Sequence, residues 1–197
     1  IGLQYVLFSS GYAPQISATM LGSEYSWLMV LGAFLGVSML ANWWATSQTS
    51  KAIQYLGLGL FTVAEAIIFV PLLYIAQARA GADVIAQAGI ITVGLFLGIT
   101  AVVFLTRKDF SFLGPILMIA FFVTLVLIVV SLTFKFSLGM IFCYVMVAFA
   151  GASILYETSN VMHRYNTNQH VAASLSLFAS IALLFWYILR IFMGSRD

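Results

Sequence analysis

The chain has 197 residues, of which 63% are hydrophobic and only 7% are charged, and its formal net charge is +2. Soluble domains carry roughly 25% charged residues, so this composition excludes a water-soluble globular protein. The small net charge and the lack of a basic cluster argue against nucleic-acid binding. The single cysteine, Cys143, excludes an internal disulfide and argues against a thiolate metal site.

Seven apolar runs follow one another along the chain, separated by short polar interruptions. They cover residues 1–9, 27–44, 55–76, 88–105, 113–134, 138–155 and 171–193. The first run is expected to be the tail of a span, followed by a loop that extends to residue 24. A span needs about 20 residues, and continuous apolar runs favour helices over barrel strands. The sequence therefore predicts an all-α membrane protein, a single domain over residues 1–197 with seven transmembrane helices.

The beginning of the chain and its glycines add two expectations. No basic segment with a cleavage site precedes the first run, so no signal peptide is indicated and the natural N-terminus is expected upstream. Pairs of small residues in three spans predict close helix contacts, within the chain or, as the alternative, between two copies. The pairs are Gly32 with Gly36, Gly57 with Gly59, and Gly94 with Gly98. Pro71 removes a backbone donor late in its span and predicts a kink.

The distribution of lysine and arginine over alternate loops predicts the orientation of the chain. One side carries Lys51, Arg107, Lys108 and Arg164. The other carries Arg79, Lys135 and Arg196, with Arg190 near the end of the last span. The small excess of lysine and arginine on the first side predicts that the loops at 106–109 and 157–163 lie in the cytoplasm and the C-terminus outside.

Two glutamates lie in or beside the apolar runs. Glu65 lies in the middle of the span 55–76, where a carboxylate must be protonated, paired or hydrated. It is either a proton or cation site or a neutral side chain bonded to a neighbouring helix. Glu157 is expected to end the span 138–155 and is followed by three polar residues. On composition alone, Glu157 simply ends a helix at the interface; the alternative is a place at the lip of a wet vestibule.

The histidines and the remaining polar residues give no catalytic pattern. His163 could respond to cytoplasmic pH, because its ordinary pKa is near 6.5, whereas His170 suits the headgroup layer. Polar residues inside the spans, Ser176 and Ser180 among them, are expected to bond to carbonyls of their own helices. No metal-ligand spacing, nucleophile elbow or phosphate loop is present in the sequence. The sequence therefore predicts a protein that is not an enzyme and has no cofactor.

Three segments resemble the bacterial YccA-like branch of the Bax inhibitor-1 family. They are Ser153–Asn160 (SILYETSN) together with His163, the loop at 106–113 (TRKDFSFL), and the end Gly194-Ser195-Arg196-Asp197. The likeness extends from the second span to the last. It implies a fold of seven helices in which six surround a central C-terminal one. It also implies that part of the first helix and a cytoplasmic N-terminal tail are absent from this chain.

The resemblance implies two activities. Some members of the wider family are pH-sensitive calcium leak channels gated by an acidic pair, whose positions correspond to Glu157 and Ser180. Since serine replaces the second carboxylate, repulsion between like charges cannot gate this chain, and Glu65 is a candidate replacement. Calcium would then be the permeant ion.

The YccA-like branch, in contrast, binds and restrains the membrane protease FtsH, in membrane protein quality control and the stress response. This implies a multi-pass protein of the bacterial inner membrane, with the lipid bilayer, FtsH and its associated membrane proteins as partners. The candidate interaction loops contain Arg107, Lys108, Asp109, Asn160 and Arg164.

Overall fold

The computed structural model describes residues 2–47 and 50–194. These residues form helices joined by short connections, without a strand, and six of the helices are long and apolar enough to span a bilayer. The prediction of an all-α membrane protein is confirmed. The backbone contacts divide the chain into two compact units, Ile1–Gly81 and Ala82–Asp197. Ser195, Arg196 and Asp197, which contribute to the resemblance and to the charge count, lie outside the described residues.

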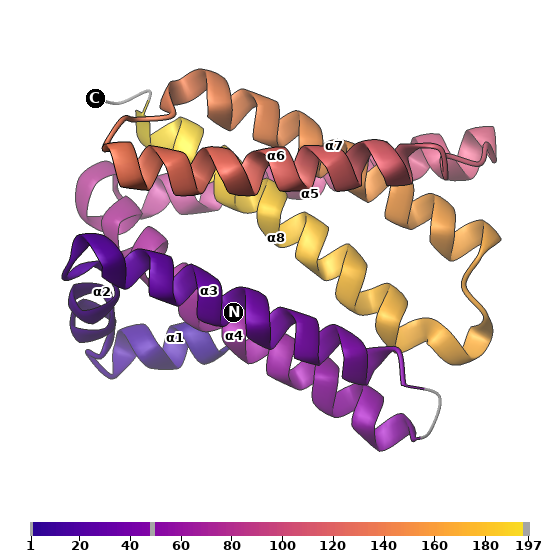
Figure 1. Ribbon diagram of the computed structural model, residues 1–197, viewed down its shortest axis with the longest axis horizontal. Helices are drawn as coiled ribbons and strands as arrows, with labels where there is room; N and C mark the ends of the chain where they lie inside the picture. Colours follow the sequence, from indigo (N-terminus) through magenta and orange to yellow (C-terminus); the bar gives the residue numbers. More distant parts are fainter. Residues whose placement is uncertain (1, 48–49, 195–197) are drawn as a thin grey trace. The chain divides into compact units, whose positions relative to one another are not determined.

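The first unit is organised around one long helix. It contains α1 (Gly2–Ser9), α2 (Ala13–Leu21), α3 (Glu24–Ala45) and α4 (Lys51–Ala80). α4 contacts each of the other three, and α3 runs beside it along most of its length (Figure 1). It continues through Pro71 without interruption and extends beyond both ends of the apolar run 55–76. α1 has eight residues, too few to cross a bilayer.

The expectation of a loop up to residue 24 is wrong, because α2 occupies Ala13–Leu21. Pro14, which suggested a loop, lies in the first turn of this helix. A proline is tolerated there because the first amide groups of a helix have no intrahelical acceptor. Ser23 then caps α3 by accepting a hydrogen bond from the Ser26 N–H at 3.1 Å.

The close helix contact predicted from small residues occurs at Gly57, between α3 and α4. A Cβ atom on Gly57 would lie 2.5 Å from the Ala41 carbonyl oxygen and 2.9 Å from the Trp44 Cβ. One turn later Phe61 packs against Phe34, with ring centroids 6.1 Å apart. The glycines of the other predicted pairs, and Gly59, have open space where a side chain would begin. The predicted packing within the chain is therefore confirmed at this one position.

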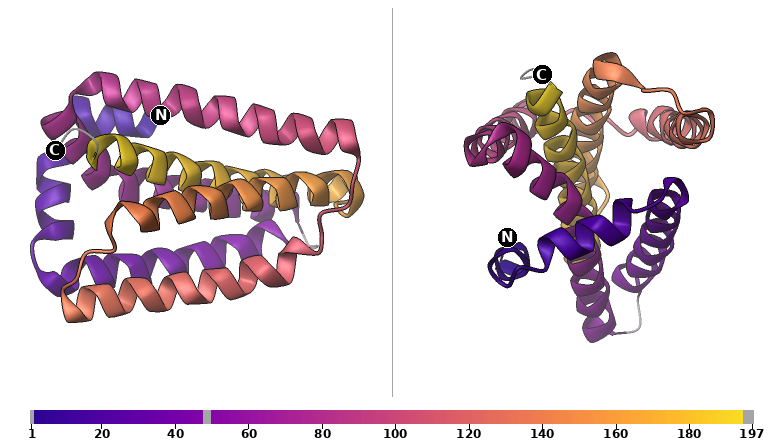
Figure 2. Two further views of the ribbon diagram at one scale, coloured as in Figure 1. Left: turned by 90° about the horizontal axis from the view of Figure 1, so that it is seen from above. Right: turned by 90° about the vertical axis from the view of Figure 1, so that its left-hand side faces the viewer.

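The second unit contains α5 (Ala82–Thr106), α6 (Leu113–Phe134), α7 (Gly139–His163), the short 3-10 helix η1 (Thr167–Gln169) and α8 (His170–Gly194). α7 contacts α5, α6 and α8, and it lies between α5 and α6 (Figure 2). α6 exposes almost all of its apolar side chains. Such a surface belongs against lipid, since soluble proteins rarely expose so large an apolar area.

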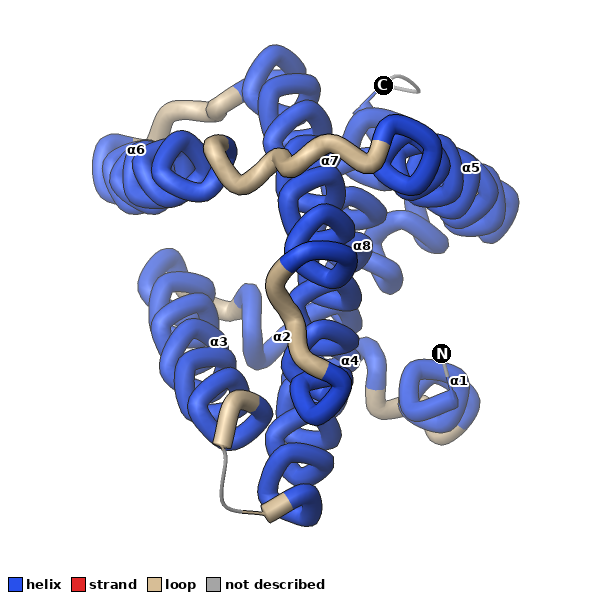
Figure 3. Tube along the Cα trace, turned by 90° about the vertical axis from the view of Figure 1, so that its right-hand side faces the viewer, coloured by secondary structure: helices blue, strands red, loops and turns tan. Residues whose placement is uncertain are grey.

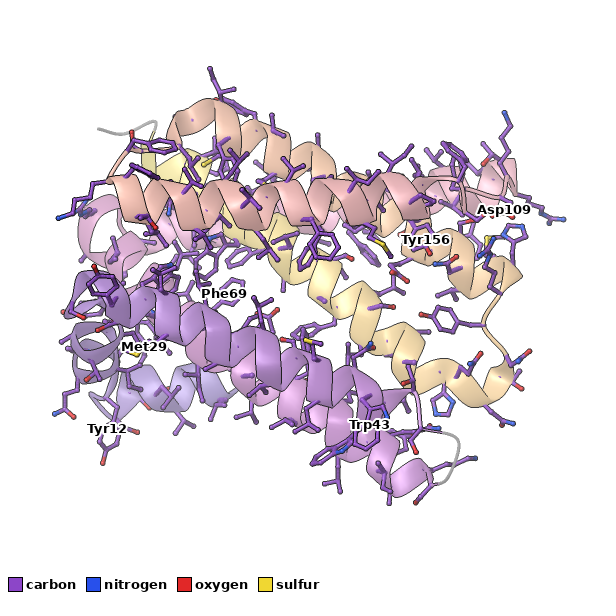
Figure 4. All side chains as sticks on the ribbon, viewed as in Figure 1. Tyr12, Met29, Trp43, Phe69, Asp109 and Tyr156 are labelled. Atoms are coloured by element: carbon purple, nitrogen blue, oxygen red, sulfur yellow. The ribbon has the colours of Figure 1, made fainter. Side chains whose placement is uncertain are left out.

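Exposed aromatic residues in the first unit also suit a membrane boundary. Trp43 is exposed near the end of α3 (Figure 4), and its neighbour Trp44 packs on Gly57. Tryptophan is enriched at the level of the lipid headgroups. The fold is therefore that of a multi-pass helical membrane protein.

Candidate functional site

Helix α7 continues past Glu157 to His163, so the expectation that Glu157 ends its span is wrong. The polar residues Thr158, Ser159 and Asn160 suggested a helix end, but all three are buried. The helix ends where the Asn160 carbonyl accepts from the backbone N–H groups of Arg164, at 2.8 Å, and Tyr165, at 2.9 Å. Glu157 therefore lies within a continuous helix, two turns before its end.

The connection between α5 and α6 docks on this last part of α7. The Phe110 N–H donates a hydrogen bond to the Ser159 hydroxyl at 2.9 Å, across 49 positions of sequence. The Ser159 side chain is 0% exposed. Figure 3 shows the loop crossing the end of α7. The structure thus joins two of the three segments that carry the family resemblance, 106–113 and 153–160.

Two further contacts hold this connection in place. The Asp109 carboxylate accepts a hydrogen bond from the Ser111 N–H at 2.9 Å. This bond, helped by the charges of Arg164 and His163, lowers the pKa of Asp109 below its ordinary value. At the start of α6, the ring of Tyr156 covers Gly114, where a Cβ atom would lie 3.1 Å from the tyrosine hydroxyl. Figure 4 labels Asp109 and Tyr156 at this end of the second unit.

A polar cluster surrounds Glu157 between α7 and α8. The Glu157 carboxylate interacts with the side chains of Ser176 on α8 and Asn160 on α7. The hydroxyl of Tyr165, in the connection between these helices, also interacts with Ser176. Burial raises the pKa of Tyr165, and the neighbouring Glu157 raises it further. Tyr165 therefore stays protonated at neutral pH and can donate a hydrogen bond.

Three oxygens at this end of α7 are buried without a protein partner: Glu157 Oε2, Thr158 Oγ1 and Asn160 Oδ1. Buried polar atoms in folded proteins normally have a partner, which can be an ordered water, a proton or an ion. The oxygens around Glu157 suit a hard ligand such as water or a cation rather than a soft metal. No group of three His, Cys, Asp or Glu side chains comes together anywhere in residues 2–47 and 50–194.

Ser180 lies one turn farther along α8 than the serine that interacts with Glu157. α7 and α8 run antiparallel beside one another, and Ser176 is the α8 residue beside Glu157. Ser180 is buried and lies about 6 Å farther along the axis, because a helix rises about 1.5 Å per residue. A carboxylate at position 180 would therefore need a long reach to share a proton with Glu157.

The other predicted site residues are distributed over both units. Glu65, only 8% exposed, lies on α4 in the first unit, one turn beyond Phe61. His163 and Arg164 lie at the end of α7, and the His163 Nδ1 is 3.0 Å from the Ser159 carbonyl oxygen. Asn160 is buried with the polar cluster rather than exposed in a loop. Arg107 and Lys108 are exposed.

Sequence reasoning did not single out Tyr165, and it treated Ser176 as a residue bonded only to its own helix. Ser176 does donate to the Ala173 carbonyl at 3.2 Å, so that expectation is correct but incomplete. The only sequence signal for the cluster was that both residues follow Glu157 within about twenty positions, flanking one short connection.

Comparisons with known proteins point to one family. The family described as "Inhibitor of apoptosis-promoting Bax1" matches residues 1–197. Protein LIFEGUARD 4 of Arabidopsis thaliana is 34% identical over 150 residues, which are 73% of this chain and 59% of that protein. Bax inhibitor 1 of Schizosaccharomyces pombe is 30% identical over 174 residues, which are 85% of this chain and 62% of that protein.

A bacterial relative has a more specific name. Modulator of FtsH protease YccA of Escherichia coli (strain K12) is 37% identical over 117 residues, which are 58% of this chain and 53% of that protein. The chain thus spans between half and two thirds of the length of these relatives.

Proposed function

The chain belongs to the Bax inhibitor-1 family, and on that premise we propose that it modulates an FtsH-type protease. It would act as a binding protein in the bacterial inner membrane, where its similarity to YccA places it, and not as an enzyme. The six apolar helices in the described residues support the membrane location. Control of the turnover of other membrane proteins would be its physiological role.

The observation that carries this proposal is the docking of the 107–112 connection on α7. An isolated loop offers a partner no fixed shape, and ordering it on binding costs free energy. Here the hydrogen bond from Phe110 to Ser159 fixes the loop in advance. The exposed Asp109 is thereby held near Arg164, whose charge acts on it, and the exposed Arg107 and Lys108 precede it in the same connection. We propose that this surface faces the cytoplasm and contacts the protease.

Co-purification from bacterial membranes in mild detergent tests the proposal. The full chain should retain FtsH, and its overproduction should slow the degradation of a membrane substrate of the protease. Asp109→Lys should weaken the association because it reverses a charge on the proposed surface. Lys135→Glu, at the other end of α6, is the matched charge reversal and should have no effect. Absence of association with the unaltered chain would refute the proposal.

A pH-sensitive calcium or cation leak is the second candidate, and the buried, unpartnered Glu157 Oε2 favours it. A carboxylate oxygen without a protein partner inside a span must be protonated, hydrated or bound to an ion. In this case Glu157 is the gate, and Ser176, Tyr165 and Asn160 replace the second carboxylate of the family's acidic pair. Ser180 lies one turn from this cluster on α8 and takes no part in the proposed gate, whereas Glu65 stays a candidate for the replacement carboxylate.

Liposomes that contain the chain and a calcium-sensitive dye test the leak. We expect a calcium flux that changes with pH and is altered by Glu157→Gln. Asp83→Asn, which removes an exposed carboxylate in the first turn of α5, is the control and should leave the flux unchanged. A flux that is absent at every pH, or the same in the Glu157→Gln variant, would reject this second candidate.

A further inference from the structure

Three exposed cationic residues lie in the segments that follow α5 and α7 in the second unit. Arg107 and Lys108 follow α5 directly, Arg164 follows α7 directly, and all three are exposed. The hydrogen bond between Phe110 and Ser159 joins the two segments. We call Arg107, Lys108 and Arg164 the cationic cluster. The hydrogen bond between Phe110 and Ser159 fixes the position of the loop that carries Arg107 and Lys108 relative to the end of α7.

The backbone at Arg107 turns sharply away from the helix. Its N–H still donates to the Val103 carbonyl at 2.9 Å, which completes the last turn of α5. Its φ of 51° is in the left-handed region, which ends a helix and which residues other than glycine seldom adopt. The chain then leads toward α7, where the Phe110 N–H meets the Ser159 hydroxyl.

Exposed apolar residues stand beside the cationic cluster in the sequence, which suits the depth of the lipid headgroups. Leu105, 84% exposed, precedes Arg107 by only two residues, and Phe112, 62% exposed, begins the return into α6. Two residues correspond to about 3 Å along a helix axis, whereas the headgroup layer is about 5–7 Å thick on each side of the hydrocarbon. If Leu105 and Phe112 contact hydrocarbon, the cationic groups reach the phosphate layer.

The charge of this surface remains positive after its one acidic residue is counted. Asp109 is the only carboxylate in the connections 107–112 and 164–169. It accepts the Ser111 N–H, and the charges of Arg164 and His163 act on it. Arg107, Lys108 and Arg164 together with Asp109, His163 left out of the count, give a net charge of +2 at this surface.

We infer that Arg107, Lys108 and Arg164 form a binding site for the phosphate of an anionic lipid headgroup. Guanidinium groups bind phosphate oxygens with two parallel hydrogen bonds, and lysine adds a point charge. The exposed Leu105 and Phe112 would contact the acyl chains of the same lipid. A lipid bound there would cover the loop that docks on Ser159 and would stabilise its closed position.

Native mass spectrometry of the full chain, with phosphatidylglycerol and phosphatidylcholine added separately, tests this site. Phosphatidylglycerol should bind more tightly, and Arg107→Gln should weaken its binding about fivefold, the usual effect of one cationic residue at an anionic membrane surface. Lys135→Gln removes one positive charge about 33 Å away, at the other end of the 22-residue helix α6, and is the matched control. Equal binding of the two lipids, or equal weakening by both variants, would overturn the inference.

Two further measurements distinguish a lipid site from a free-anion site and from a protein surface. Inorganic phosphate at the same concentration should not displace the lipid, because it lacks the acyl chains; complete displacement would show a free-anion site instead. If Arg107→Gln weakens co-purification of FtsH while lipid binding stays unchanged, the cluster is a protein surface and the inference is wrong. The inference goes beyond the proposed function, since lipid binding is measured on the purified chain without a protease.

Discussion

Replacing Ser159 by alanine should release the connection between α5 and α6. The substitution removes the acceptor of the Phe110 N–H while changing the volume of the buried side chain very little. A hydrogen bond of this kind contributes about 1 kcal/mol net, and up to about 3 kcal/mol when its donor stays buried and unpartnered. Because the Phe110 amide lies in a short loop that can turn outward to water, we expect the smaller value.

A loss of about 1 kcal/mol corresponds to a roughly fivefold rise in the population of the open loop. Two measurements on the reconstituted chain report that population. Hydrogen exchange at the Phe110 amide should become about fivefold faster, and trypsin should cleave after Arg107 and Lys108 faster by a similar factor when opening is rapid. Both side chains are exposed, so trypsin can bind either of them once the backbone of the loop has opened.

The matched control is Ser153→Ala in the same helix. The Ser153 hydroxyl donates to the Phe149 carbonyl at 2.9 Å, a bond within α7 that holds no other segment. Its loss should leave both the exchange of the Phe110 amide and the cleavage of the loop unchanged. Equal behaviour of the two serine variants would refute the conclusion that Ser159 fixes this loop.

Contacts and charges elsewhere in the chain give three other predictions. Gly57→Ala should destabilise the protein by about 1–3 kcal/mol because the new Cβ meets the backbone of α3, whereas Gly59→Ala, with open space, should be neutral or stabilising in thermal unfolding. The lowered pKa of Asp109 stabilises the closed loop above the ordinary aspartate pKa, and this contribution is lost as pH falls through the lowered value. Hydrogen exchange at the Ser111 amide, corrected for its intrinsic pH dependence, should therefore accelerate below about pH 4; the same acceleration in Asp109→Asn would contradict the assignment to this carboxylate. The raised pKa of Tyr165 keeps its contribution to stability intact below pH 10 and removes it as pH rises through the folded-state value. The tyrosinate absorbance that Tyr165→Phe abolishes should thus develop above pH 10, and its appearance below pH 10 would contradict the burial of this residue.

The apolar runs predicted the spans well because hydrophobic length is a local property of the sequence. The long helices from α3 to α8 contain the runs predicted for them, except that α7 begins one residue later than its run, at Gly139. Their ends were less predictable. Polar residues such as Thr158 and Asn160 look like a boundary, yet they continue the helix because the packing of the second unit buries them. Hydropathy indicates whether a side chain favours an apolar or a polar environment, but it does not indicate which neighbouring residues will bury that side chain in the fold.

Contacts between distant segments could not be predicted from spacing. The bond between Phe110 and Ser159 depends on how the α5–α6 connection crosses α7. The interaction of Glu157 with Ser176 depends on the register of two antiparallel helices. A shift of one turn along α8 would bring Ser180 to this position instead. The family resemblance points to a partner of Glu157 on the last helix, and the register places Ser176 of that helix beside it.

The two candidate functions use opposite sides of one turn of α7. Successive residues of a helix are separated by about 100°, so Ser159 points about 200° away from Glu157, whereas Asn160, three positions on, shares the side of Glu157. The loop contact is therefore on one side and the polar cluster on the other. Both depend on the same helix end, because the Asn160 carbonyl caps α7 and positions Tyr165 beside Ser176. A partner that pulled the loop from Ser159 would act on a turn that also holds the carboxylate, so modulation of a protease and control of a leak need not be separate properties of this helix.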